Sequence, residues 1–272
     1  MKLLYVTYNF PPMAGAGVFR PLRFLPHFAK QGVVTTVVCG GADRVRATDA
    51  GLLEKVPEGL AVHRLDNPEF SLMARIQRRL GLSRGEHFPD DAVSWAARAA
   101  PTIRRLAAES DVVLVSAPPF SSIEVTIEAA KASGRKVVIE YRDEFSSNPL
   151  MHDGRDAGSR ERAASWERRM LQAACHVVTV AGGIAARLAS LAGIEQGRIS
   201  VIENGYDEAD FSQPVARPAD KFRSVYAGYL YTGRSPEPWW RALAEIRAQS
   251  PGIESRMEIQ VLGRMAGEYS AL

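Results

Sequence analysis

The sequence contains little cysteine and no long apolar run. Its two cysteines, Cys39 and Cys175, are too few for a disulfide framework or a structural zinc quartet, so we expect a reducing, cytoplasmic environment. The five histidines lack the i, i+4 spacing of a helical metal site, and we expect no bound metal. No stretch approaches the roughly 20 apolar residues that cross a bilayer, which predicts no transmembrane helix.

A large charge of one sign is also absent. The formal net charge of +3 is too small to indicate a nucleic-acid-binding protein. Only six of the 34 basic residues are lysine, and the rest are arginine. Arginine pairs well with phosphate and carboxylate groups, but codon bias in a GC-rich genome explains the same composition. The composition therefore identifies no partner.

What the sequence does contain is an alternation of β-rich runs with longer helical patterns. Such alternation predicts a parallel sheet with helices on both faces, an α/β fold of the Rossmann-like type. The expected strands are 3–7, 33–39, 61–65, 112–116, 136–141, 176–180 and 199–202. The expected helices are 18–29, 71–81, 91–109, 121–133, 161–173 and 184–191.

Residues 208–221 interrupt this alternation with two prolines and no periodicity, which predicts a linker after a first domain at 1–207. The alternation restarts over 222–272 with one β-α-β unit, whose expected elements are 222–227, 238–248 and 257–262. Two strands and a helix bury too little apolar surface to fold alone. We therefore expect an incomplete second domain, so that the chain is a fragment or these elements lean on the first domain or on a partner.

A glycine-containing loop, with Gly15, Ala16 and Gly17, joins the first strand to the first helix. The start of a helix offers free N–H groups and the positive end of a dipole, which suits a phosphate. A tight turn without a ligand explains the glycines equally well. Arg20 and Pro21 stand where a dinucleotide-binding fingerprint has its third glycine, so we expect no NAD site.

Arg142 and Asp143 follow the expected strand 136–141. Ligands of open α/β sheets bind at the carboxyl ends of strands, so this pair is a candidate for binding a sugar hydroxyl or a phosphate. A structural ion pair is the alternative interpretation.

A basic amphipathic segment at 73–84 is a candidate for contact with an anionic membrane surface. Such contact would place the protein peripherally at the inner face of the membrane. The solvent-exposed face of an ordinary helix explains the same pattern. The arginines concerned are Arg75, Arg78, Arg79 and Arg84.

Six segments follow one another in a recognisable order. They are YVTYNFPPMAGAGVFRPLRF (5–24), FPDDAVSWAARAA (88–100), DVVLVSAPPFSS (111–122), EYRDEFSSNP (140–149), ISVIENGYD (199–207) and FRSVYAGYLYTGRSPEPWWRAL (222–243). Each has modest specificity. Taken together, the segments resemble family-4-like glycosyltransferases of the two-domain GT-B fold.

The resemblance implies transfer of a sugar from a nucleotide diphosphate sugar to an acceptor hydroxyl, with retention of anomeric configuration and without a metal or cofactor. It makes 1–207 the acceptor domain and 222–272 the start of the donor domain. The acceptor would be a surface polysaccharide or a lipid-linked glycan. By this resemblance Gly15, Ala16, Gly17 and Arg234 bind the donor phosphates, Asp143 and Arg142 are catalytic, and Pro12, Ser116 and Asn204 contact the acceptor.

The sequence departs from the family at Tyr229, where relatives usually have an arginine. Because the rest of the donor domain is expected to be missing, we expect the chain alone to be inactive or to need a complementing donor-domain polypeptide. Two other interpretations stay open. One is a non-catalytic module that binds the acceptor or a partner transferase, and the other is a nucleotide-sugar epimerase of the same fold.

Overall fold

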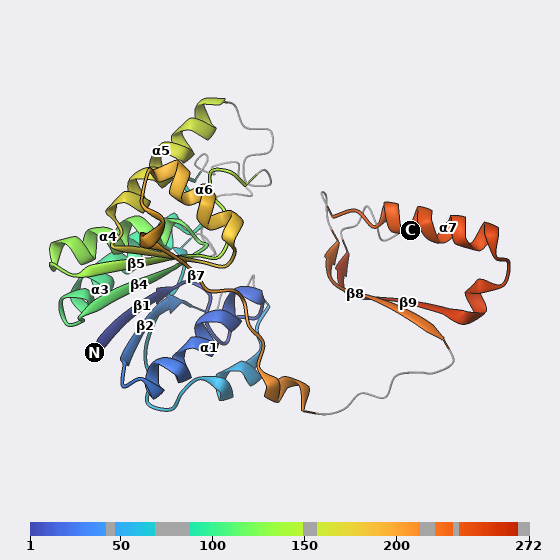
Figure 1. Ribbon diagram of the computed structural model, residues 1–272. Coiled ribbons are helices and arrows are strands. Elements are labelled where there is room, and N and C mark those ends of the chain that lie inside the picture. The colour runs from blue at the N-terminus through green and yellow to red at the C-terminus, as the bar shows by residue number, and fades with distance from the viewer. Residues whose placement is uncertain (42–46, 69–86, 149–156, 213–220, 231–233, 266–272) are drawn as a thin grey trace, which may run out of the picture. The chain divides into compact units, whose positions relative to one another are not determined.

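The computed structural model describes residues 1–41, 47–68, 87–148, 157–212, 221–230 and 234–265. The chain divides into two compact units, unit 1 (Met1–Asp207) and unit 2 (Glu208–Leu272) (Figure 1). No described helix is long and apolar enough to cross a bilayer. The expected helix at 71–81 lies outside the described residues, as do Arg75, Arg78, Arg79 and Arg84.

Unit 1 is built on one sheet of seven strands in the order β3-β2-β1-β4-β5-β6-β7. All of its neighbouring strands pair in parallel, which confirms the predicted parallel α/β sheet. The central strands are almost wholly apolar because such strands are buried on both faces. The strands are β1 Lys2–Thr7, β2 Val34–Gly40, β3 Ala61–Leu65, β4 Val112–Ala117, β5 Lys136–Tyr141, β6 His176–Thr179 and β7 Ile199–Val201.

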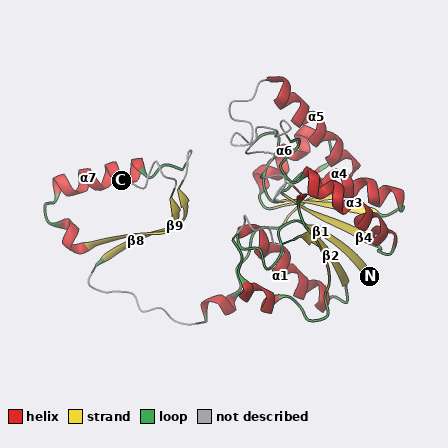
Figure 2. Cartoon of the chain, turned by 180° about the vertical axis from the view of Figure 1, so that it is seen from behind, coloured by secondary structure: helices red, strands yellow, loops and turns green. Residues whose placement is uncertain are grey.

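Helices cover both faces of this sheet, as predicted (Figures 1 and 2). Helix α1 (Ala16–Lys30) lies on one face. On the other face lie α3 (Val93–Ala108), α4 (Ser121–Ala132), α5 (Ala157–Ala173) and α6 (Gly182–Ala192). Right-handed crossovers require this arrangement, because the chain moves along the sheet in opposite directions from β1 to β3 and from β4 to β7.

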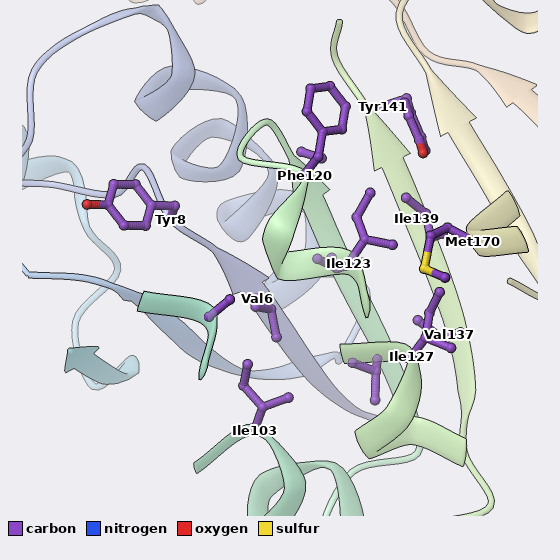
Figure 3. Packing of buried hydrophobic residues seen from close by; sticks show 14 of the residues in the cluster. Val6, Tyr8, Ile103, Phe120, Ile123, Ile127, Val137, Ile139, Tyr141 and Met170 are labelled. Atoms are coloured by element: carbon purple, nitrogen blue, oxygen red, sulfur yellow. The ribbon is translucent and has the colours of Figure 1, made fainter. Parts of the chain in front are cut away.

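The hydrophobic core follows the alternation of side chains along the strands. In β1, Leu4 and Val6 join the larger cluster, whereas Leu3 and Tyr5 join a second cluster with Leu25 of α1. Figure 3 shows part of the larger cluster, where residues of β1, α3, α4 and β5 meet, among them Val6, Ile103, Ile123 and Ile139. Because the side chains on each face of β1 pack into a different cluster, β1 is buried on both faces at the centre of unit 1.

Unit 2 contains the expected β-α-β unit. Strands β8 (Phe222–Leu230) and β9 (Met257–Met265) pair in parallel, and α7 (Glu237–Gln249) connects them (Figure 2). Both strands extend three residues beyond the expected ends. The segment expected as a linker begins with a short 3₁₀ helix, Glu208–Phe211.

Candidate functional site

The carboxyl ends of β1, β4 and β5 bring three loops to one edge of the unit 1 sheet. These strands are neighbours in the sheet, so the loops that follow Thr7, Ala117 and Tyr141 meet there. From β1 the chain continues to β2 on one side, while β4 lies on the other side. Open α/β sheets bind ligands at such a change of direction, which makes this edge the candidate site.

Arg142 ties the three loops together. Its guanidinium donates from Nη1 to the carbonyl of Gly17 at 2.7 Å, from Nε to the carbonyl of Ala117 at 3.3 Å, and from Nη2 to the carbonyl of Pro118. Its own backbone N–H also donates to Ala117, at 2.9 Å. Burial lowers the pKa of this guanidinium, while Tyr5, Glu140 and Asp143 raise it. The side chain therefore holds the loops in place rather than projecting into solvent.

Gly17 packs directly against Arg142. A Cβ atom at this position would lie 2.8 Å from Nη1 of Arg142 and 2.8 Å from Nδ2 of Asn9. The absence of a side chain here is therefore required by contacts within the chain. The family resemblance implies that Gly17 contacts the donor phosphates, whereas the contacts seen in the structure are with Arg142 and Asn9.

The start of α1 keeps the features that suit an anion. Gly15 precedes the helix with φ of 127°, a backbone conformation that favours glycine. Nothing within 4 Å would contact a Cβ atom there. No side chain caps this helix, and its first turn contains no acidic residue. Gly15 and Ala16 are exposed, so the N–H groups and positive dipole end at this position can approach a phosphate.

Asp143 is exposed at the same edge, one residue beyond Arg142. Arg142 and Asp143, which the sequence suggested as a pair, therefore lie in different environments. The guanidinium is bonded to backbone carbonyls, and the carboxylate lies at the surface of unit 1. A surface carboxylate next to a fixed arginine can accept a hydrogen bond from a substrate hydroxyl.

The three residues expected to contact the acceptor lie in different surroundings. Pro12 is half-buried, and its carbonyl accepts from the backbone N–H of Asp49 at 2.8 Å. Ser116 is completely buried and donates to Oε2 of Glu140 at 2.5 Å, a placement that does not support a direct acceptor contact. Asn204 is exposed in the loop after β7, where its Oδ1 accepts from Arg20 at 3.3 Å.

A buried ion pair that the sequence did not predict lies beside this edge. Arg20 of α1 donates from Nε to Oε1 of Glu140, at the end of β5, over 2.8 Å, and both side chains are buried. Tyr5 donates to Oε2 of the same carboxylate at 3.3 Å. In the sequence, Arg20 is notable only because it stands where a dinucleotide-binding fingerprint has its third glycine. Its partner is 120 residues away, which no local pattern shows.

Arg234 of unit 2 is exposed and lies just before α7. Among the residues that the structure describes, no three His, Cys, Asp or Glu side chains lie close enough together to hold a metal ion.

Residues 22–210 match the family described as Glycosyltransferase Family 4. No curated protein matches the sequence.

Solved structures share the fold at low sequence identity. HepE from Anabaena, solved with UDP and glucose, has a TM-score of 0.56 at 15% identity, over 100% of this chain and 63% of its own. The lipopolysaccharide outer core galactosyltransferase WaaB, in its apo form, has a TM-score of 0.51 at 14% identity, over 97% and 68%. A putative UDP-N-acetylglucosamine 2-epimerase from Listeria monocytogenes has a TM-score of 0.53 at 13% identity, over 96% and 61%. This chain thus spans less than two-thirds of the length of HepE and of the epimerase.

Proposed function

Because the chain belongs to glycosyltransferase family 4, we propose that it takes part in transferring a sugar from a nucleotide diphosphate sugar to an acceptor hydroxyl. The observation that carries this proposal is the family match over residues 22–210, which covers most of unit 1 and includes Arg142 and Asp143 of the candidate site. The fold alone does not distinguish a transferase from an epimerase, because it is common to both classes of enzyme. The family match favours transfer, because the matching family is one of glycosyltransferases.

The start of α1 is the proposed contact for the donor diphosphate in unit 1. Its support is the exposed, uncapped helix start at Gly15 and Ala16. Arg142 contributes by holding the carbonyl of Gly17, which fixes the first turn of the helix. Arg234 is the proposed cation from unit 2, and its planar guanidinium suits a phosphate.

Asp143 is the proposed residue for the reacting sugar or the acceptor hydroxyl. Its exposure at the sheet edge supports this role, because a carboxylate that bonds a substrate must be accessible. We propose further that transfer retains the anomeric configuration and proceeds without a metal ion, as the family resemblance implies. The helix dipole and Arg234 can balance phosphate charge in such a reaction.

The proposed acceptor is a glycan, either in a surface polysaccharide or linked to a lipid. One structural neighbour, WaaB, is a lipopolysaccharide galactosyltransferase, and another, HepE, was solved with UDP and glucose. UDP-glucose and UDP-galactose are therefore the first donors to test, followed by GDP- and dTDP-linked sugars.

The test is product formation from this panel with lipid-linked and polysaccharide acceptors, by the chain alone and by the chain completed with a donor-domain polypeptide, detected by mass spectrometry. The anomeric configuration of the product is read by NMR, and a parallel reaction contains EDTA. In the completed enzyme, Asp143→Asn should lower turnover by about a hundredfold, the size typical of one acid–base group, with little change in Tm. Turnover within a few-fold of the parent would mean that Asp143 has no role in the chemical step. Binding of an acceptor without transfer, even by the completed enzyme, would favour the non-catalytic module instead.

A further inference from the structure

The loop that follows β7 is bonded to α1 by two arginines. Arg20 donates from Nη2 to the carbonyl of Ile202 at 2.7 Å and from Nη1 to the carbonyl of Glu203 at 3.0 Å. One turn along the helix, Arg23 donates from Nη1 to the carbonyl of Gly205 at 2.8 Å. Two neighbouring side chains of one helix thus hold three of the four carbonyls of residues 202–205.

Arg20 is oriented for this role from its other side. Its Nε is bonded to Glu140, whose second carboxylate oxygen accepts from Ser116 and Tyr5. Its guanidinium also lies 4.7 Å from the centre of the Phe24 ring. All three nitrogens of the guanidinium therefore have partners, in a planar arrangement that lysine cannot reproduce.

A cavity of about 410 Å³ lies between α1 and this loop, and Phe19, Phe24, His27 and Tyr206 contribute to its walls. The two arginines and Asn204 also line it, but they are bonded to one another or to backbone carbonyls. These three side chains therefore connect two segments of the chain across the cavity.

Residues 202–205 end only two residues before unit 2 begins at Glu208. We propose that Arg20 and Arg23 are a clamp that holds residues 202–205 on α1 and fixes the point from which the chain leaves unit 1. The expected linker 208–221 then starts from one place on unit 1, and its length limits the positions that unit 2 can reach. Arg20 and Arg23 are thus positioning residues, because they act through the chain segment that they hold. The inference goes beyond the proposed function, since it concerns the placement of unit 2 whether or not a sugar is transferred.

The first measurement is amide hydrogen exchange in the complete chain. The N–H of Ile202 donates to the carbonyl of Thr179 at 2.8 Å and reports release of the segment. In Arg20→Lys, its exchange should rise about tenfold, the effect of losing one hydrogen bond from a charged donor. Amides of β5 should change less. Equal increases in β5 and at Ile202 would show that Arg20 only stabilises unit 1, and would overturn the clamp.

The second measurement is the distance between the units, by double electron–electron resonance. One spin label is placed on Cys175, which is exposed in unit 1, and the other on Glu245→Cys of α7. Cys39 stays unlabelled because it is buried, which raises the pKa of its thiol to about 12. Arg23→Ala removes the outer half of the clamp and leaves the buried ion pair intact. We expect its distance distribution to be broader than that of the parent, with an unchanged Tm.

Arg105→Ala is the matched control, since Arg105 is an exposed, ion-paired helix arginine elsewhere in unit 1. It should leave both the distribution and the exchange of Ile202 as in the parent. The clamp is overturned if Arg23→Ala gives the same distribution as Arg105→Ala. It is equally overturned if Arg20→Lys, folded as judged by its circular dichroism, also leaves the distribution unchanged.

Discussion

Gly17 decides how closely α1 can approach the loops after β1 and β5. Replacing it with alanine puts a methyl group 2.8 Å from both Arg142 and Asn9, and these must move. We expect a loss of stability of about 1–3 kcal/mol, as for other overpacked positions. Transfer activity should fall with it, because Arg142 would lose its bond to the Gly17 carbonyl. Thermal unfolding and initial rates measure the two effects.

Gly183 provides a control for this substitution. It is the second residue of α6, as Gly17 is of α1, and no atom lies within 4 Å of its would-be Cβ. Gly183→Ala should therefore keep or slightly raise the Tm, since alanine favours the helix. A Gly17→Ala variant with the parent's Tm but no activity would contradict this prediction and would show that Gly17 is needed only for ligand binding.

Glu167 of α5 should make stability depend on pH. It is buried, its Oε2 accepts from the backbone N–H of Ser146 at 3.1 Å, and its Oε1 has no hydrogen-bond partner among the described residues. Burial raises the pKa of this carboxyl above 4.5, and the nearby Glu144 raises it further. A raised pKa favours the neutral form in the folded state. Its contribution to stability is therefore complete below the unfolded pKa and is lost as pH rises through the folded pKa.

Glu167→Gln keeps this side chain neutral at every pH. The unfolding free energy of the parent, relative to that of the variant, should be higher at about pH 5 than at about pH 8. Urea unfolding at both pH values measures this, with the exposed Glu109→Gln as the matched control. A difference that stays constant between the two pH values would mean that Glu167 titrates in the ordinary range.

At the scale of elements, Asp90 joins the starts of two helices. Its carboxylate accepts from the backbone N–H groups of Phe120 and Ser121, at 2.5 and 3.1 Å, where α4 begins. It also accepts from the N–H of Ala92, at 3.0 Å, just before α3. We expect Asp90→Ala to lower the unfolding free energy by about 1–2 kcal/mol, the upper range for loss of a cap. The neighbouring Asp91 is exposed, and Asp91→Ala should unfold like the parent in the same thermal scan.

Strands were easier to predict than the ends of helices, for a physical reason. The short length and β-branched residues of an apolar run such as 112–116 favour a buried strand over a helix, and β4 is found within one residue of it. Helix α5 begins at Ala157, four residues before the predicted start at 161. Its first turn was missed because that turn is largely exposed and has no apolar pattern. Apolar periodicity indicates the face that a helix buries, and it gives no signal for a turn that lies in solvent.

The candidate site was predicted in its location and not in its contacts. Strand order brings the ends of β1 and β5 to one edge, so Gly15 and Asp143 could be assigned to it from the sequence. The partners of Arg142 are carbonyls 24 to 125 residues away, which depend on how the loops pack. Arg20 was missed for the same reason, since a charged residue in a helix is expected in solvent until its buried partner is known.

At the scale of the whole molecule, the two units differ in how well they bury their strands. In β1, Leu4, Tyr5 and Val6 have no exposed surface, and β2 and β4 flank the strand on both sides. In β8, Phe222 and Val225 are 66% and 49% exposed. Of the described side chains of unit 2, only Leu230 and Pro236 are buried. Unit 2 therefore has much less buried apolar surface to oppose local opening.

We expect the amides of β8 and β9 to exchange at a lower opening free energy than those of β1, in the complete chain under native conditions. Hydrogen exchange followed by mass spectrometry resolves the two units in one experiment. Protection of β8 equal to that of β1 would show instead that unit 2 opens only when the whole chain unfolds.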